Sequence, residues 1–136
     1  MADTIISIGV GTAAWFLVAG ALFFNPLVGR VYRRQEGHPA VRALPPGPGT
    51  LGTIIAAVFA QTVLWAGVYL LVEPVLGDTV LDKGLRFGGI LVVTKMIPRD
   101  IDRLLLTTYP KGRMAIELVI GCVCAAVTGL VFAWLL

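Results

Sequence analysis

The residues best able to do chemistry in this chain lie in one short segment, which we call the charged stripe. It contains five charged side chains: Lys95, Arg99, Asp100, Asp102 and Arg103. At about 100° per residue, a helix would gather Lys95, Arg99, Asp102 and Arg103 toward one side and leave Ile97, Ile101, Leu104 and Leu105 on the other. Three cations and two carboxylates sum to +1. The leftover cation could attract an anionic group of a ligand.

Spacing within the charged stripe predicts ion pairs along a helix. Asp100 and Arg103 are three residues apart, as are Arg99 and Asp102, and side chains at this spacing are neighbours on a helix surface. Glu117 lies in the apolar segment that follows and is predicted at a similar depth in a membrane. We expect Glu117 to pair with the leftover cation.

Pro98 and Gln61 complete the candidate site. Pro98 has no N–H to donate to the carbonyl of Thr94, so a kink is expected there, and the freed carbonyl is a candidate partner for Lys95. Gln61 adds a polar side chain near the middle of an earlier apolar segment. Two interpretations remain open. The stripe lines a polar cavity that opens to the cytoplasm and binds an anion, or it bends into the membrane interface with its charges among the headgroups.

The other reactive side chains do not combine into a catalytic or metal site. Ser7 is the only serine and His38 the only histidine. They are predicted at opposite membrane faces, so the hydroxyl lacks the base that nucleophilic catalysis needs. Cys122 and Cys124 would point about 200° apart on a helix, so they can neither bridge each other nor hold one metal. We predict no catalytic residue, no cofactor and no metal.

The composition indicates a membrane protein. The chain has 136 residues, of which 57% are hydrophobic and 14% charged, against about 45–50% and about 25% in soluble domains. A soluble domain of this length buries only about two-thirds of its surface. It could not hide so many apolar side chains from water.

Four apolar segments are long enough to cross a bilayer as helices. They cover residues 5–24, 51–73, 80–107 and 114–136, and about 20 residues suffice for a hydrocarbon layer about 30 Å thick. None alternates strictly as a strand of a membrane barrel does. The predicted fold is all-α: a single domain, residues 1–136, forming an integral membrane bundle of four transmembrane helices, the third long and kinked at Pro98.

The basic residues predict the orientation. Loops 25–50 and 108–113 hold Arg30, Arg33, Arg34, Arg42, Lys111 and Arg113, whereas the opposite side holds only Lys83 and Arg86. The positive-inside rule places both loops in the cytoplasm and both termini outside, in the cytoplasmic (inner) membrane of a bacterium. This topology accounts for the net charge of +3, so nucleic acid is not an expected partner.

The first of these loops contains a proline-rich run, residues 44–49, with the sequence LPPGPG. Proline fixes φ and removes a hydrogen-bond donor, so this run is predicted to be non-helical. A semi-rigid cytoplasmic connector is the favoured interpretation. A docking site for a partner is the alternative.

Small residues recur at four-residue spacing in three of the predicted helices. They are Gly52, Ala56 and Ala60, then Gly84 and Gly88, then Gly121, Ala125 and Gly129. Such residues let helix backbones approach closely. The sequence leaves open whether they meet within one chain or between chains, and self-association through these faces is expected. The aromatic Trp15, Trp65 and Tyr69 are expected as packing residues or interface anchors, not as a ligand cage.

The order of these features resembles a known family. Residues 21–30, ALFFNPLVGR, are similar to the aromatic-X-Pro-leucine-glycine-basic signature of the small four-helix bacterial membrane proteins grouped as DUF1761. The glycine-bearing third helix with Pro98, the basic turn 109–113 and the final helix with Gly121 and Trp134 are similar in placement. That family is uncharacterised, so the resemblance implies the topology and no activity.

Two functions from different classes follow. The first is a homo-oligomeric binding or transport protein, with a cytoplasm-facing polar site built from the charged stripe, Glu117 and Gln61. The second is an accessory or structural subunit of a larger membrane complex, in which the charges and the proline-rich loop are contact surfaces. A membrane enzyme holding Mg²⁺ on Asp100 and Asp102 is less favoured, because they would lie about 160° apart and arginines adjoin them.

Overall fold

The computed structural model describes residues 2–136, with side chains from Asp3 onward, and every regular element in that range is helical. The elements are α1 (Ala2–Phe23), α2 (Pro26–Arg34), α3 (Pro48–Val72), the 3₁₀ turn η1 (Glu73–Val75), α4 (Val80–Leu91), the π-helical turn η2 (Val92–Met96), α5 (Ile97–Leu106) and α6 (Lys111–Leu135). Helix accounts for 82% of the chain. The predicted all-α fold class is confirmed.

Three of these helices are long and apolar enough to cross a membrane: Asp3–Phe23, Pro48–Val75 and Lys111–Leu135. They coincide with three of the four predicted spans and indicate that the chain is integrated in a membrane. The remaining predicted span, 80–107, forms one helical rod of α4, η2 and α5. Its charged second half distinguishes it from the three apolar helices.

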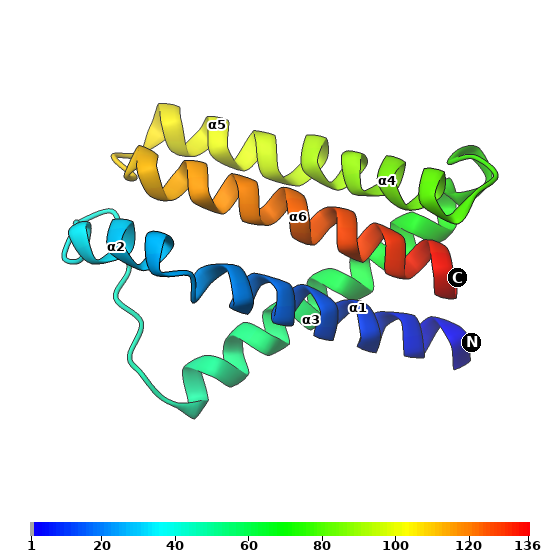
Figure 1. Cartoon of the computed structure of the whole chain (residues 1–136), viewed down its shortest axis with the longest axis horizontal. Helices are drawn as coiled ribbons and strands as arrows, with labels where there is room; N and C mark the ends of the chain where they lie inside the picture. The colour runs from blue at the N-terminus through cyan, green and yellow to red at the C-terminus, as the bar shows by residue number, and fades with distance from the viewer. Residues whose placement is uncertain (1) are drawn as a thin grey trace.

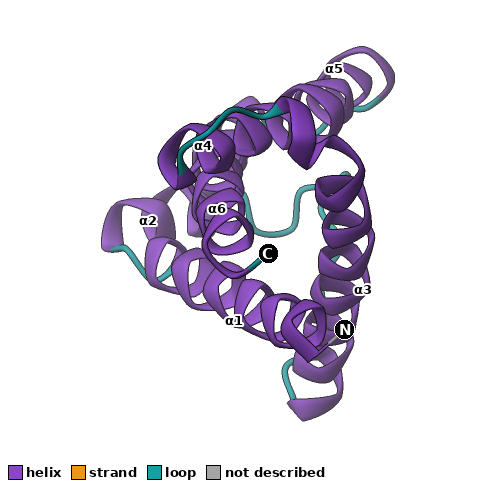
Figure 2. Ribbon diagram, turned by 90° about the vertical axis from the view of Figure 1, so that its right-hand side faces the viewer, coloured by secondary structure: helices purple, strands orange, loops and turns teal. Residues whose placement is uncertain are grey.

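The helices form a bundle in which α6 lies between two neighbours (Figure 1). The α4–α5 rod runs along one side of α6, α1 packs on another side, and α3 crosses α1 obliquely. Viewed along the bundle axis, α3 and α2 lie on opposite sides of the bundle (Figure 2). Both termini lie at one end of the bundle, and α2 with the α5–α6 turn lies at the other.

The contact between α4 and α6 is made through small residues. A Cβ at Gly88 would lie 2.9 Å from the Cα of Ala126, and a Cβ at Gly84 would lie 2.8 Å from the Cα of Leu130. A Cβ at Gly129 would overlap the carbonyl oxygen of Gly84. Two of the three predicted small-residue faces therefore pack against each other within the chain, as close backbone approach requires.

An aromatic cluster fills the core beside this contact. Tyr69 of α3 meets Phe87 of α4 and Phe132 of α6, with ring centroids 5.0 and 5.8 Å apart. All three side chains are almost completely buried. Tyr69 is thus a core residue, and the expectation that it packs holds over the alternative of an interface anchor. Edge-on aromatic packing of this kind adds to the burial of apolar area.

The disturbance expected at Pro98 takes the form of a π-helical turn just before it. The N–H of Ile97 donates to the carbonyl of Val92, the wider spacing that defines η2. A π turn is one of the few features that bend a helix, and it accommodates the missing N–H of Pro98 without ending the rod. The α4–α5 rod therefore continues alongside α6 (Figure 1).

The loop predicted over residues 25–50 is shorter than expected, because helices occupy both of its ends. Asn25 caps α2, its side-chain Oδ1 accepting from the N–H of Leu27 at 2.9 Å, and Pro26 occupies the first helical position. The last two residues of the proline-rich run, Pro48 and Gly49, form the first turn of α3. Proline is well tolerated at a helix N-terminus, where its missing N–H has no partner to lose.

Candidate functional site

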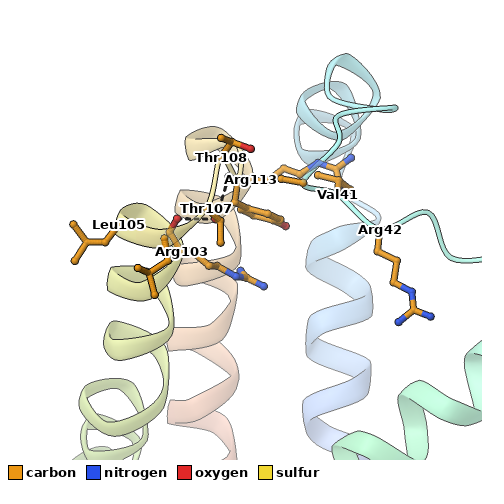
Figure 3. A pocket seen from close by; sticks show the side chains of 10 residues that line it. Val41, Arg42, Arg103, Leu105, Thr107, Thr108 and Arg113 are labelled. Carbon is orange, nitrogen blue, oxygen red and sulfur yellow. Dashed lines mark hydrogen bonds between the residues drawn. The ribbon is translucent and has the colours of Figure 1, made fainter.

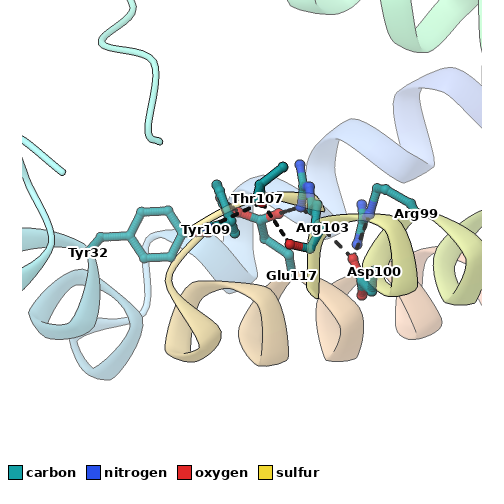
Figure 4. Close-up of polar contacts among 7 residues, drawn as sticks. All are labelled: Tyr32, Arg99, Asp100, Arg103, Thr107, Tyr109 and Glu117. Carbon is teal, nitrogen blue, oxygen red and sulfur yellow. Dashed lines mark hydrogen bonds and ion pairs between the residues drawn. The ribbon is translucent and has the colours of Figure 1, made fainter. Parts of the chain in front are cut away.

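The polar centre of the molecule is the carboxylate of Glu117 on α6 (Figure 4). Its Oε2 accepts from Arg103 Nη1 of α5 at 2.5 Å, and its Oε1 accepts from the hydroxyl of Tyr32 of α2 at 3.2 Å. The hydroxyl of Tyr109 donates to the same Oε1. We call these four side chains the Glu117 cluster. It ties together α2, α5, α6 and the turn between the last two.

The turn that carries Tyr109 is fixed by Thr107. The Thr107 hydroxyl donates to the carbonyl of Arg103 at 2.7 Å and accepts from the N–H of Tyr109 at 3.2 Å. Backbone groups freed at the end of α5 are therefore satisfied locally, as helix ends require. This arrangement directs the Tyr109 ring back toward Glu117 (Figure 4).

The charged stripe extends the cluster along α5. Arg99 Nε donates to Asp100 Oδ1 at 2.8 Å, and Arg103 Nη1 lies 3.9 Å from that oxygen. Asp100 is only 8% exposed. Within residues 2–136, the buried Asp100 Oδ2 and Arg99 Nη2 have no hydrogen-bond partner. The expected Arg99–Asp102 pair is not formed, because Arg99 turns to its neighbour Asp100 while Asp102 is exposed.

Two arginines stack on the tyrosines of the cluster. The guanidinium of Arg103 lies 4.4 Å from the centroid of the Tyr109 ring, and that of Arg113 lies 4.2 Å from the Tyr32 ring. Arg113 Nη2 also donates to the carbonyl of Tyr32 at 2.9 Å. In the described part of the chain, no carboxylate lies within 4.0 Å of Arg113. Its positive charge is therefore held in place by an aromatic face and a carbonyl group.

Both tyrosines of the cluster are kept protonated. Burial raises the pKa of Tyr109 above its ordinary value of 10.0, and the hydrogen bond to Glu117 raises it further. Burial also raises the pKa of Tyr32, and the charge of Glu117 adds to the rise. A phenolate beside a carboxylate is disfavoured by like-charge repulsion. Both hydroxyls therefore act as hydrogen-bond donors at neutral pH.

A large open pocket adjoins the cluster at the loop end of the bundle (Figure 3). Its volume is about 880 Å³, and its wall includes three arginines, Arg42, Arg103 and Arg113, together with Tyr109. We call it the basic pocket. Arg42 comes from the loop before α3, and the other two come from α5 and α6.

Arg42 and Arg113 were not among the site residues predicted from the sequence. Both were identified only as topology charges, although topology already places their two loops at one end of the bundle. Their convergence on one pocket depends on the path of loop 35–47, which carries no repeating pattern. The sequence signal for this convergence was that topology places both loops at the same end of the bundle.

Lys95 and Gln61 form a second polar group, which shares no hydrogen bond with the Glu117 cluster. Lys95 Nζ donates to Gln61 Oε1 of α3 and lies 4.1 Å from the Trp65 ring centroid and 5.0 Å from that of Trp15. The two tryptophans pack tilted against each other at 4.9 Å. Gln61, and not the carbonyl of Thr94, is therefore the hydrogen-bond partner of Lys95.

The predicted site residues thus divide into two groups and one outlier. Arg99, Asp100, Arg103 and Glu117 come together through direct contacts, Lys95 joins Gln61, and Asp102 stands apart on the surface. Comparison of the sequence with protein-family models and curated proteins, and of the fold with solved structures, finds no match. The resemblance to DUF1761 stays a prediction, and the site must be interpreted from its own geometry.

Proposed function

We propose that this chain is a small polytopic protein of the bacterial inner membrane that binds or transports an anionic solute. The observation that carries the proposal is the basic pocket, where three arginines surround a volume of about 880 Å³. Only Arg103 among them has a carboxylate within 4.0 Å in the described structure. Arg42 and Arg113 leave uncompensated positive charge, which favours an anion.

We further propose that the α4–α5 rod is the fourth transmembrane span. Exposed apolar side chains lie along its outer face, with Ile101 at 49% and Leu105 at 73% exposure, although Asp102 of α5 is exposed as well. Its charges at Asp100 and Arg103 turn toward α6 instead. A charge at the bilayer centre costs about 2.5–3.5 kcal/mol on insertion scales, so it should face the protein interior. This distribution supports a span more than a helix lying flat in the interface.

The proposed orientation has the basic pocket in the cytoplasm and both termini outside. The termini lie together at one end of the bundle, and the basic loops lie at the other. Six basic residues at the loop end against two at the other support this assignment.

Titration calorimetry of the purified protein in mild detergent tests anion binding, with inorganic phosphate as the probe. We expect saturable binding that Arg42→Gln weakens about fivefold, corresponding to about 1 kcal/mol for a partly exposed charge contact. Arg34→Gln is the matched control, because Arg34 is an exposed arginine of α2 that does not line the pocket. Absence of phosphate binding, or equal binding by both variants, contradicts the proposal.

An accessory or structural subunit is the second candidate function, and the first half of α3 favours it. Residues 51–57 are all exposed, and a Cβ added at Gly52 would meet nothing within 4 Å. Gly52, Ala56 and Ala60 form the one predicted small-residue face whose members are all exposed in the described chain. We propose that self-association of this protein, or its contact with another membrane subunit, uses this face.

The mass of the particle released from native membranes by mild detergent separates the two candidates. A single species at a small multiple of 14.5 kDa supports the homo-oligomeric binding or transport protein. Stoichiometric foreign subunits support the accessory subunit. An Ala56→Leu substitution should disrupt either assembly, because a larger side chain keeps facing helices apart.

A further inference from the structure

A second, smaller cavity also adjoins the Glu117 cluster. It has a volume of about 200 Å³ and is lined by residues of α1, η2, α5 and α6. Glu117 lines this inner cavity, while its partners Arg103 and Tyr109 line the basic pocket. The cluster is therefore a shared wall between the two hollows.

The lining of the inner cavity combines apolar side chains with three charged groups, which are two cations and the carboxylate of Glu117. Trp15 and Phe23 of α1 are its aromatic members, and Ile120 and Cys124 of α6 add apolar surface. The cations are Lys95 and Arg99. Apolar walls with a few polar groups are typical of sites for small organic ligands.

Lys95 has no counter-ion among the described residues. Its Nζ contacts a neutral amide oxygen and two indole rings, and no carboxylate lies within 4.0 Å of it. The carboxylates of Asp100 and Glu117 are engaged by Arg99 and Arg103 instead. The surplus in this part of the molecule is therefore one positive charge, and it resides on Lys95. Removing a cation from water costs free energy unless an anion accompanies it.

Arg99 also lines this cavity and carries an unused hydrogen-bond donor. Its Nε donates to Asp100, but its Nη2 is buried without a hydrogen-bond partner within residues 2–136. Buried donors of this kind are uncommon in folded proteins and call for a ligand or water. A carboxylate could accept from the Lys95 ammonium and from Arg99 together.

We propose that the inner cavity binds a small organic monocarboxylate, with its carboxylate between Lys95 and Arg99 and its apolar body against Trp15 and Phe23. One surplus charge matches a monoanion, whereas a dianion such as a phosphate ester would leave uncompensated negative charge. The volume corresponds to about seven water molecules, which suits a short-chain acid. This inference rests on the proposed function, since it names the substrate class of the charged stripe, but it concerns a separate cavity.

Tryptophan fluorescence of the full-length protein in detergent tests the proposal, with butyrate as the probe and neutral butyramide as its control. The chain has three tryptophans, and Trp134 is exposed near the C-terminus, far along α6 from the cavity. We expect a saturable change with butyrate and none with butyramide. Trp15→Phe should remove most of the change, and Trp134→Phe should keep it.

Variants at Lys95 test whether its positive charge binds the carboxylate of butyrate. Lys95→Gln should weaken butyrate binding about tenfold or more, as expected for a lost charge-assisted hydrogen bond. Lys95→Arg should retain most of the binding, and Lys111→Gln, at an exposed lysine of α6, should retain all of it. Equal responses to butyrate and butyramide, or unchanged butyrate affinity in Lys95→Gln, would overturn the proposal.

A cavity-filling variant covers the case in which Lys95→Gln fails to fold. Ala19 lines the cavity, so Ala19→Leu occupies the space and leaves every charge in place. It should abolish the butyrate response, and an unchanged response would overturn the proposal.

The phosphate titration with Arg42→Gln reports on the basic pocket alone. Failure at that pocket with butyrate binding intact therefore rejects the proposed function without rejecting this site, and the reverse result rejects only this site.

Discussion

The two halves of the α4–α5 rod pack against the same helix, α6, in different ways. The α4 half meets α6 through glycine and alanine, so closely that a Cβ at Gly88 would lie 2.9 Å from a backbone atom. The α5 half meets α6 through the Arg103–Glu117 pair. Backbone contact leaves no room between helices, whereas long charged side chains hold them apart.

This difference explains where the two charged hollows lie. The inner cavity and the basic pocket both adjoin α5, where ion pairs and aromatic rings replace backbone contact. The glycine contact fixes the position of the rod at the other end. A helical rod can therefore be anchored by one half and carry a polar site on the other.

The largest expected effect comes from the anchoring half. Gly88→Leu should lower the free energy of unfolding by about 3 kcal/mol, because the new side chain meets the backbone of α6, which cannot yield. Gly89→Leu is the matched control at the next position, where a Cβ meets nothing within 4 Å. Unfolding in mixed detergent micelles, followed by circular dichroism, measures both. Equal losses would show that the glycine contact does not anchor the rod.

A smaller effect is expected at the polar half. Glu117→Gln removes the carboxylate partner of Arg103 and should lower the free energy of unfolding by about 1.5 kcal/mol, near the upper end for interhelical polar contacts in membranes. Asp102→Asn, at an exposed carboxylate without an ion pair among the described residues, should change it by less than about 0.5 kcal/mol. The same unfolding assay compares the two. A loss at Asp102→Asn as large as that at Glu117→Gln would contradict the network described for Glu117.

Much of the fold could be predicted from the sequence, because apolar length is a strong signal. The helices of 3–23, 48–75 and 111–135 follow from it directly. Helical spacing and membrane depth predicted a contact between Glu117 and the charged stripe, and Glu117 pairs with Arg103. The leftover cation, with which Glu117 was expected to pair, is Lys95, and it contacts Gln61 instead. Helix α2 was not predicted. The Asn25 cap that begins it is a local signal, and the segment that contains it was interpreted as a loop.

The details of the site depended on tertiary structure that spacing could not reveal. Face assignments made at about 100° per residue do not carry across the π turn, which inserts extra residues into the rod. The pairing of Arg99 with Asp100 in place of Asp102 lies within α5, beyond the π turn, and depends on side-chain conformation that spacing does not specify. The contacts of Lys95 with Trp15 and Trp65 join three separate helical segments, so no local pattern could predict them.

Capping of α2 offers a weaker test of the polar end. Asn25→Ala removes the side-chain acceptor of the Leu27 N–H and should destabilise α2 by about 1 kcal/mol. Because Tyr32 of α2 donates to Glu117, the loss should appear as faster hydrogen exchange in α2 and the α5–α6 turn, and not in α4. Asn25→Asp keeps an acceptor and should exchange like the wild type. Faster exchange in α4 would mean that the two halves of the rod are coupled.

The smallest expected effect is a loss of stability at alkaline pH, confined to the end of the bundle that carries the Glu117 cluster. Burial and Glu117 raise the folded-state pKa of Tyr109 above 10.0, so its protonated form stabilises the fold. That contribution is complete below pH 10 and is lost as the pH rises through the raised pKa. Phenolate absorbance of the Tyr32→Phe/Tyr69→Phe double variant, in which Tyr109 is the one remaining tyrosine, should follow the titration of Tyr109, and adding Glu117→Gln should move it to lower pH. An unmoved titration would mean that burial alone, without the Glu117 carboxylate, holds the phenol protonated.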